Sequence, residues 1–258
     1  MPIFGLGTWM LKGQEGNNAV SWAIEEGYRL IDTATFYGNE REIGKAVVNS
    51  QIPREELFIT SKVWNSDQGY EKTLNAFEKS LKRLNMSYLD LYLIHWPVSG
   101  LRIETWKALE RIYQEGRARA IGISNFTIRH IQELLENATI TPMVNQVEFS
   151  PFLYQKDLLE YCQSKEVRLE AYAPLTRGTQ FKNPLLKTIS LKHNKTVAQI
   201  LIRWGLEHDI IEIPKSSDKQ HLKENANVFD FELDSIDMKQ LDGLNKNLRL
   251  VDDPNQYI

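Results

Sequence analysis

Short apolar runs alternate with longer amphipathic segments along the chain, and eight such pairs can be counted. The apolar runs predict strands at residues 3–7, 29–32, 57–62, 89–95, 118–124, 143–148, 168–172 and 210–214. The segments with helical spacing predict helices at residues 17–26, 41–50, 70–84, 103–115, 127–137, 155–165, 196–208 and 219–226. Strands that alternate with helices indicate a parallel sheet, and eight repeats favour a closed barrel over an open sheet. We therefore predict an α/β fold of the (β/α)8 TIM-barrel type.

Two further helical patterns, at residues 183–193 and 234–244, have no strand of their own and predict two helices added to the barrel. The connection after His95 is only a few residues long, and the tail after Asn245 is short. We expect short loops over the catalytic face and a comparatively open pocket. No low-complexity linker or change of composition divides the chain, so we predict a single domain over residues 1–258.

Composition excludes several classes of function. With 31 basic and 34 acidic residues the formal net charge is −3, which does not favour nucleic acid or an anionic membrane as a partner. Cys162 is the only cysteine, so an intrachain disulfide and a multi-cysteine metal site are excluded, and we predict no metal. No run reaches the roughly 18 apolar residues of a spanning helix, and no secretory signal begins the sequence. We expect a cytoplasmic protein, acting as a monomer.

Polar residues end seven of the eight predicted strands. They are Asp32, Ser61-Lys62, His95-Trp96, Ser124-Asn125, the run 145–148, Tyr172 and Lys215-Ser216. A strand has to meet solvent somewhere, so one polar residue in such a place means little. In a (β/α)8 barrel, however, the carboxyl ends of all strands form one rim, and this rim carries the chemistry. Seven polar strand ends in succession therefore indicate an active site.

Four residues of this rim suggest acid–base chemistry: Asp32, Tyr37, Lys62 and His95. A free phenol has a pKa of about 10, and a nearby ammonium is expected to lower it. A carboxylate would keep that ammonium charged, and a histidine could orient the same substrate oxygen. Taken singly, each has an ordinary structural interpretation: a turn cap, a packed aromatic, a lysine that reaches solvent and a core histidine. Their arrangement on successive strand ends favours a group that protonates a carbonyl oxygen as hydride arrives at the carbon.

Five motifs resemble the signatures of the aldo-keto reductase family, in the family's order. They are Asp-Thr-Ala at 32–34 with Tyr-Gly-Asn-Glu at 37–40, Tyr-Leu-Asp-Leu-Tyr-Leu-Ile-His-Trp-Pro at 88–97, Gly-Ile-Ser-Asn-Phe at 122–126, Val-Asn-Gln-Val-Glu at 144–148 and Ile-Pro-Lys-Ser at 213–216. The resemblance covers nearly the whole chain. It implies an NADPH-dependent reductase of aldehydes and ketones, which is an oxidoreductase acting on CH–OH groups in the reverse direction.

The resemblance also implies roles for individual residues. Tyr37 would be the general acid/base, Lys62 and Asp32 its tuning pair, and His95 the residue that orients the carbonyl. The implied cofactor contacts are Ser124, Asn125 and Gln146 to the nicotinamide carboxamide, Tyr172 to the ring, Lys215 and Ser216 to the 2′-phosphate, and Glu224 and Asn225 near the adenine. The implied substrate wall consists of Trp9, Phe36, Trp64 and Trp96.

Two positions depart from the family pattern. His221 stands where many members carry an arginine to the 2′-phosphate, and Ala173 stands where a serine is common. A mostly neutral histidine would lose one charge-assisted contact, worth about 1.5 to 3 kcal/mol. NADPH is the expected cofactor, with use of NADH left open. No Gly-x-Gly-x-x-Gly follows a strand, so a Rossmann site is not supported.

Other functions remain open at this point. A lyase on the same barrel could use Lys62 or Lys215 as a Schiff-base nucleophile. A non-catalytic sensor could bind NADPH and report it to a partner. The short loops resemble the microbial branch of the family, related to diketogluconate reductase and prostaglandin F synthase-like members, which acts on small aldehydes, keto sugars, diketones and α-keto esters. The sequence does not decide the physiological substrate or the preferred direction.

Overall fold

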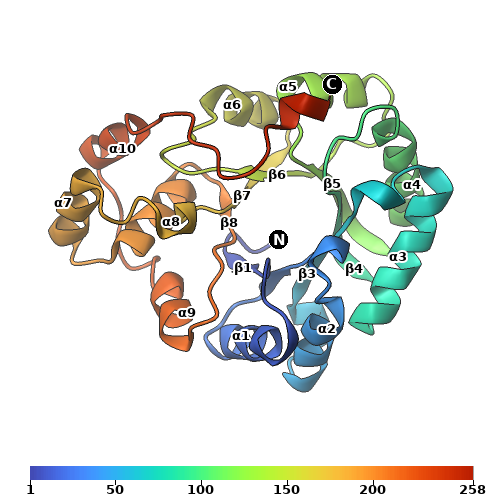
Figure 1. Cartoon of the computed structure of the whole chain (residues 1–258), viewed down its shortest axis with the longest axis horizontal. Helices are drawn as coiled ribbons and strands as arrows, with labels where there is room; N and C mark the ends of the chain where they lie inside the picture. Colours follow the sequence, from blue (N-terminus) through green and yellow to red (C-terminus); the bar gives the residue numbers. More distant parts are fainter. Residues whose placement is uncertain (258) are drawn as a thin grey trace.

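Eight parallel strands form the centre of the fold and pair in chain order (Figure 1). The computed structural model describes residues 1–257. The strands are β1 (Gly5–Gly7), β2 (Leu30–Asp32), β3 (Phe58–Val63), β4 (Leu89–Ile94), β5 (Ala118–Ser124), β6 (Val144–Glu148), β7 (Arg168–Tyr172) and β8 (Ile211–Glu212). Backbone hydrogen bonds from Glu212 to Ile3 and from Gly7 to Pro214 join β8 to the start of the chain. The predicted (β/α)8 barrel is confirmed.

Within residues 1–257, ten α-helices surround the strands (Figure 1). Eight follow the strands: α1 (Gly13–Glu25), α2 (Glu40–Asn49), α3 (Tyr70–Leu84), α4 (Arg102–Gln114), α5 (Ile128–Leu135), α6 (Lys156–Ser164), α8 (Val197–Glu207) and α9 (Lys219–Ala226). The two predicted additional helices are α7 (Pro184–His193) and α10 (Ser235–Asp242). None of the helices in residues 1–257 is long and apolar enough to cross a membrane.

Element bounds differ from the sequence prediction by four residues at the start of α1, by two at one end of β1, α5, β8 and α10, and by at most one elsewhere. The first helix begins at Gly13 rather than at residue 17. The sequence did not predict this start, because its first turn contains Gly13 and Gly16 and glycine has a low helix propensity. The last strand is reduced to Ile211–Glu212, since Pro214 has no N–H to continue the ladder. The first strand begins at Gly5 rather than at residue 3. None of these differences moves a strand end away from the rim.

The two faces of the barrel have different chemistry, because successive residues of a strand point to opposite sides. Outward side chains form one large apolar core with the helices, in which Phe77, Trp106 and Trp204 are among the largest buried members. Two smaller apolar clusters form separately from that core, around Leu30 with Ile211 and Ile213, and around Leu91 with Leu93 and Val144. Inward-facing positions of the strands carry the buried polar residues Asp32, Lys62, Gln146 and Glu170.

The C-terminal tail crosses the rim of the barrel after α10 and ends beside α5 (Figure 1). Its backbone is held at several places, first by the Leu248 N–H, which donates to the Phe152 carbonyl at 3.0 Å. The N–H of Leu250 donates to Glu148 Oε1 at 2.8 Å, and the carbonyl of Tyr257 accepts from Arg102 Nη1 at 2.9 Å. The Tyr257 ring lies 5.4 Å from the ring of Trp96. The tail up to Tyr257 therefore closes one side of the rim.

Candidate active site

A cavity of about 590 Å³ opens at the carboxyl ends of the strands. This volume is in the range of small-molecule sites. Twelve of the residues singled out in the sequence line it: Trp9, Asp32, Phe36, Tyr37, Trp64, His95, Trp96, Ser124, Asn125, Gln146, Tyr172 and Lys215. Lys62 lies beneath the lining and is fully buried. The strand ends therefore meet at one hollow, as the barrel geometry requires.

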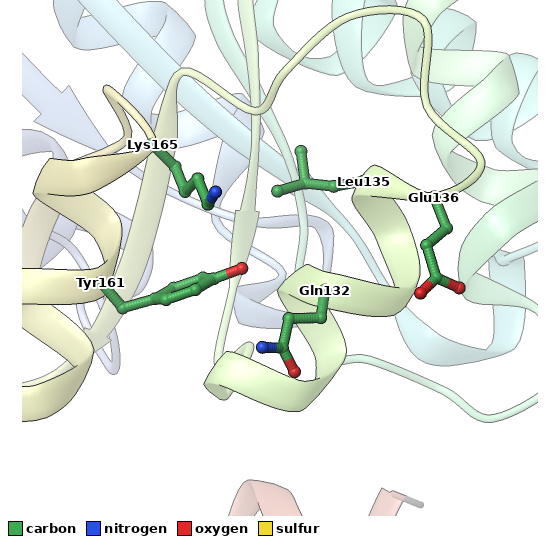
Figure 2. Close-up of a pocket in the computed structure, with 5 residues that line it drawn as sticks. All are labelled: Gln132, Leu135, Glu136, Tyr161 and Lys165. Atoms are coloured by element: carbon green, nitrogen blue, oxygen red, sulfur yellow. The ribbon is translucent and has the colours of Figure 1, made fainter.

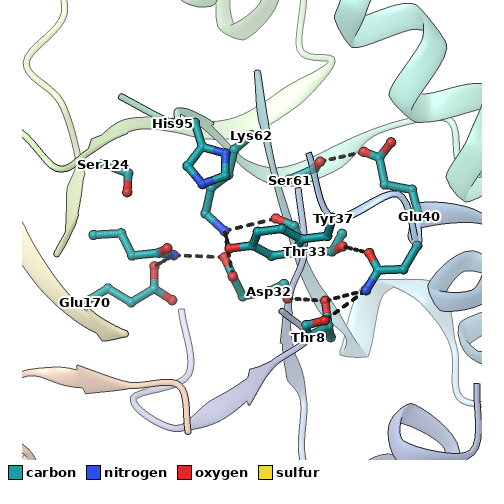
Figure 3. A network of polar contacts seen from close by, with 12 residues as sticks. Thr8, Asp32, Thr33, Tyr37, Glu40, Ser61, Lys62, His95, Ser124 and Glu170 are labelled. Atoms are coloured by element: carbon teal, nitrogen blue, oxygen red, sulfur yellow. Dashed lines mark hydrogen bonds and ion pairs between the residues drawn. The ribbon is translucent and has the colours of Figure 1, made fainter. Parts of the chain in front are cut away.

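Lys62 is the centre of the buried polar cluster (Figure 3). Its Nζ donates to Asp32 Oδ1 at 2.7 Å, to Tyr37 Oη at 3.2 Å and to the carbonyl of Thr33 at 3.1 Å. All three donor positions of the ammonium are thereby used. The lysine is supplied by β3 and the aspartate by the end of β2. An ion pair and a phenol thus meet at one nitrogen, at the floor of the cavity.

Local structure brings Tyr37 to this nitrogen. After β2 the chain makes a short 3₁₀ turn, Thr35–Tyr37, which Gly38 ends in the left-handed region at φ 67°. Asn39 fixes the turn from behind, because its Nδ2 donates to the carbonyls of Thr8 and Leu11 and its Oδ1 accepts from Thr33. Glycine tolerates this backbone conformation without a steric penalty. The turn therefore holds the phenol over Lys62.

The charges of the cluster follow from its burial. Burial alone would lower the pKa of Lys62, but the Asp32 carboxylate raises it and the balance is a pKa of about 12. The pKa of Tyr37 is raised by burial, although Lys62 lowers it in part. The sequence-based expectation of a lowered phenol pKa is therefore wrong in its net direction, because desolvation outweighs the ammonium. Near neutrality the ammonium is charged and the phenol keeps its proton.

His95 stands beside Tyr37 with its ring centroid 5.7 Å from the phenol ring. Burial, and then the Lys62 charge, hold the pKa of His95 well below its ordinary value, so the ring is neutral at physiological pH. Its Nδ1 is buried and has no hydrogen-bond partner within residues 1–257. An unpartnered N–H is costly to bury, so we assign the ring hydrogen to Nε2. A neutral histidine of this tautomer can donate a hydrogen bond into the cavity.

Aromatic rings form one wall of the cavity. Trp9 stacks on Phe36 at 5.4 Å, Phe36 stacks on Trp64 at 3.7 Å, and Trp64 meets the edge of His95 at 5.0 Å. Trp96 lines a different side, next to Tyr257 of the tail. Trp9 and Phe36 are 40% and 47% exposed, so the outer end of this wall faces solvent. The wall suits a flat or apolar substrate.

The residues expected near the nicotinamide are connected to one another. Asn125 Nδ2 donates to the His95 carbonyl at 3.0 Å, and its Oδ1 accepts from Tyr172 Oη at 2.7 Å. Ser124 Oγ lies 3.1 Å from the same Nδ2. Gln146 Nε2 donates to Asp32 Oδ2 at 2.8 Å. The Tyr172 ring is therefore fixed at its hydroxyl, and Gln146 links this group to the buried ion pair.

Of the residues expected near the adenosine and its 2′-phosphate, Lys215 lines the cavity and the others lie outside its lining. Ser216 precedes α9, while His221, Glu224 and Asn225 belong to it. The side chain of His221 is 68% exposed, and its Nδ1 lies 3.9 Å from Asp218 Oδ1. Asp218 caps α9 by accepting from the His221 N–H at 2.9 Å. The structure places these residues on one helix next to β8, but it does not bring them into the main cavity.

Several lining or supporting residues were not singled out in the sequence, among them Arg177, Val251 and Glu170. Arg177 and Val251 line the cavity, and Glu170 is buried next to Gln146. The loop that carries Arg177 is strained, because Ala173, Thr176 and Arg177 have φ of 53°, 50° and 51°. Such strain in non-glycine residues is common at functional sites. Glu170 could have been noticed in the sequence, because it is an acid within an apolar strand, two residues before Tyr172. Nothing in the sequence indicates Val251.

A second hollow lies between α5 and α6, away from the rim (Figure 2). Gln132, Leu135, Glu136, Tyr161 and Lys165 line it. None of these side chains has a buried polar atom without a partner. Within residues 1–257 no group of three or more His, Cys, Asp or Glu could hold a metal ion. The chemistry-bearing residues of the described chain are thus gathered at the cavity on the rim.

Comparisons with known proteins agree with this geometry. Residues 4–246 match the model of the aldo/keto reductase family. Glyoxal reductase of Bacillus subtilis is 52% identical over 259 residues, which cover 100% of this chain and 94% of the relative. An aldo-keto reductase from a Medee basin deep-sea metagenome library superposes with a TM-score of 0.96 at 48% identity, covering 98% and 94% of the two chains.

A third similar protein, Bombyx mori aldo-keto reductase, was solved in complex with NADP. It superposes with a TM-score of 0.92 at 37% identity, over 98% of this chain and 92% of that one. The family model and the close relatives cover the strand ends as well as the barrel. The chain belongs to the aldo/keto reductase family, and it is an oxidoreductase.

Proposed function

We propose that this protein is an NADPH-dependent reductase of aldehydes and ketones in which Tyr37 is the general acid. The observation that carries the proposal is the position of Lys62 Nζ, which contacts both Tyr37 Oη and Asp32 Oδ1 beneath the cavity. The proposal is supported by the relative named glyoxal reductase and by the NADP complex of a similar structure.

The proposed mechanism assigns one task to each residue of the cluster. When bound, the nicotinamide cofactor supplies a hydride to the carbonyl carbon. Tyr37, whose raised pKa keeps its phenol protonated, donates its Oη proton to the carbonyl oxygen. Lys62 stabilises the phenolate that this transfer leaves behind, and Asp32 keeps the ammonium in place. His95 donates from Nε2 to the same oxygen and orients it.

The cavity offers suitable groups for the cofactor. Ser124, Asn125 and Gln146 would hold the carboxamide, and the ring would lie on Tyr172, whose hydroxyl is fixed by Asn125. Arg177 and Lys215 provide two cations on the cavity lining for the phosphates. Ser216 would contact the 2′-phosphate, and Glu224 and Asn225 would lie near the adenine. The chemistry of this donor set fits a nicotinamide dinucleotide.

The substrate class follows from the wall and from the relatives. The stacked rings of Trp9, Phe36 and Trp64 and the ring of Trp96 suit small, flat or apolar carbonyl compounds. The similarity to glyoxal reductase favours dicarbonyls among them. NADPH oxidation is to be measured with glyoxal, methylglyoxal, diacetyl, an aromatic aldehyde and a keto sugar. We expect turnover with at least one dicarbonyl, and absence of turnover with the whole panel would contradict the proposal.

The Schiff-base lyase is less well supported by the structure. A lysine nucleophile needs a free amine, but the pKa of Lys62 is raised to about 12 by Asp32 against the effect of burial. Borohydride added together with substrate should leave the protein mass unchanged. A covalent adduct on Lys62 or Lys215, detected by mass spectrometry of peptides, would favour the lyase. Turnover in the same samples would exclude a purely non-catalytic sensor.

Replacing His221 by arginine should strengthen NADPH binding more than NADH binding. An arginine there could reach the 2′-phosphate and restore a charge-assisted contact, so we expect an improvement of about tenfold in the ratio of dissociation constants. Gln220→Arg adds the same charge one residue earlier on α9 and should change the ratio less. Fluorescence titration measures both constants. An unchanged ratio in His221→Arg would show that residue 221 does not face the 2′-phosphate.

Three further properties stay predictions from the sequence. They are the single domain over residues 1–258, the monomeric state and the cytoplasmic location.

A further inference from the structure

Glu170 is a buried carboxyl that the proposed mechanism does not use. It lies on β7, two residues before Tyr172, and therefore points to the same face of the strand. Its side chain is fully buried and does not line the cavity. Oε2 accepts from Gln146 Nε2 at 2.8 Å, and Oε1 has no partner in the described part of the chain. Burying such a group is costly, and its single hydrogen bond goes to an active-site residue.

Gln146 uses one nitrogen for two carboxyl groups. Its Nε2 donates to Asp32 Oδ2 at 2.8 Å and to Glu170 Oε2 at 2.8 Å, and Figure 3 shows these two acids on either side of the contact. A primary amide has two N–H donors and one carbonyl acceptor. Both donors are therefore occupied by carboxyl groups of the protein. Gln146 lines the cavity, and its Oε1 accepts no hydrogen bond from residues 1–257.

With one carboxyl alone the amide would be held at a single point. Asp32 would still accept one N–H, but the amide plane could swing about that bond and turn its second N–H toward the cavity. The second anchor removes this freedom, and rigid placement of a binding group improves recognition by lowering its ordering cost. Two anchors thus leave an acceptor, and no donor, available to a ligand.

We propose that Glu170 is a positioning residue, which anchors the second N–H of Gln146 so that only the Oε1 of this amide faces the nicotinamide carboxamide. The inference rests on the proposed function, since it concerns the same cofactor site. An acceptor at this position reads the NH₂ of a carboxamide and disfavours a ligand that carries a methyl group there. Glu170 would therefore help the protein to recognise nicotinamide without touching it.

The protonation state of Glu170 is compatible with this role. Burial, and then the charge of Asp32, raise the pKa of Glu170 to about 8. Near pH 7 the carboxyl is mostly protonated, and its carbonyl oxygen can still accept from Gln146. The pair of Asp32 and Lys62 then remains balanced, with no second negative charge beneath Tyr37. Glutamine is the closest mimic of this protonated acid, because it keeps one carbonyl oxygen.

The test compares NADPH with its reduced 3-acetylpyridine analogue, which has a methyl group in place of the carboxamide NH₂. Dissociation constants are measured by quenching of tryptophan fluorescence, since Trp9, Trp64 and Trp96 line the cavity. The wild type should bind NADPH about 3- to 10-fold more tightly than the analogue, the value of one hydrogen bond. Glu170→Leu should lose most of this preference, mainly by weaker NADPH binding, and Glu170→Gln should retain more of it.

Glu212→Leu is the matched control. Glu212 is also buried and also lacks a partner at Oε2, but it lies on the adjacent β8 and its carboxyl meets Gly205 of α8 instead of the site. The Glu212→Leu variant should prefer NADPH over the analogue as strongly as the wild type does. Thermal unfolding is measured for all variants, and Glu170→Met replaces Glu170→Leu if the latter does not fold.

The outcomes separate this inference from the proposed function. Equal weakening of both cofactors in Glu170→Leu would indicate a merely structural role and overturn the inference. An unchanged preference in Glu170→Leu, or no preference in a wild type that turns over carbonyl compounds, would overturn it too while leaving the reductase proposal intact. A wild type that binds no NADPH would overturn both.

Discussion

Tyr37→Phe should lower carbonyl reduction about 10²- to 10⁴-fold and leave NADPH binding nearly unchanged. The substitution removes only the hydroxyl that contacts Lys62 Nζ at 3.2 Å and that is proposed to donate the proton. The ring can keep its place beside His95 and Trp9. Single-turnover reduction and fluorescence titration with NADPH measure the two effects separately.

Tyr92→Phe provides the comparison for this result. The Tyr92 hydroxyl is also buried, but it has no hydrogen-bond partner in residues 1–257, and its ring packs against Phe77 away from the cavity. Its removal should leave turnover at the wild-type level. Equal turnover in Tyr37→Phe and wild type would contradict the proposed role of the phenol.

Lys62→Met should destabilise the fold by about 3 to 5 kcal/mol near neutral pH, because Asp32 loses its only cationic partner while it stays buried. Turnover should fall by about 10²-fold or more, since the developing phenolate loses the ammonium that stabilises it. Urea unfolding gives the first quantity and steady-state kinetics the second. The double variant Lys62→Met, Asp32→Asn removes both charges and should recover most of the stability without the activity.

The stability loss in Lys62→Met should depend on pH. Burial raises the pKa of Asp32 above its ordinary value, and without Lys62 nothing of comparable strength opposes this shift. The folded state then binds more protons than the unfolded state, so stability declines as pH rises through the folded pKa of Asp32. The penalty should therefore shrink toward pH 4. A penalty that stays constant between pH 4 and pH 8 would show that Asp32 does not titrate in this way.

Periodicity predicted the barrel well where elements are long and clearly ended. Helix α3, Tyr70–Leu84, matches its prediction at both ends, because Asn85 adopts the left-handed conformation at φ 56° that ends the helix. The start of α1 was missed, since its first turn contains Gly13 and Gly16, and glycine has a low helix propensity. Strand order could be inferred because the connections between parallel strands are regular.

The candidate site was predicted less evenly. Residues at strand ends could be named, since the barrel brings those ends together and the family motifs mark them. The direction of the net pKa shift of Tyr37 could not be predicted, because it depends on whether burial or the charge of Lys62 has the larger effect. Val251 comes from a tail whose path is set by contacts with distant residues. Long-range placement of this kind leaves no periodic signal in the sequence.

The attachment of the tail has a consequence for the evolution of the protein. Two of its anchors use main-chain atoms of the tail, the Leu250 N–H on Glu148 and the Tyr257 carbonyl on Arg102. Attachment at these points therefore places no demand on the identity of Leu250 or Tyr257, and Val251 between them lines the cavity. Substitutions in this segment can change the shape of the cavity while the residues proposed for proton transfer stay as they are. Diversification of substrate range is thereby separated from preservation of the chemistry.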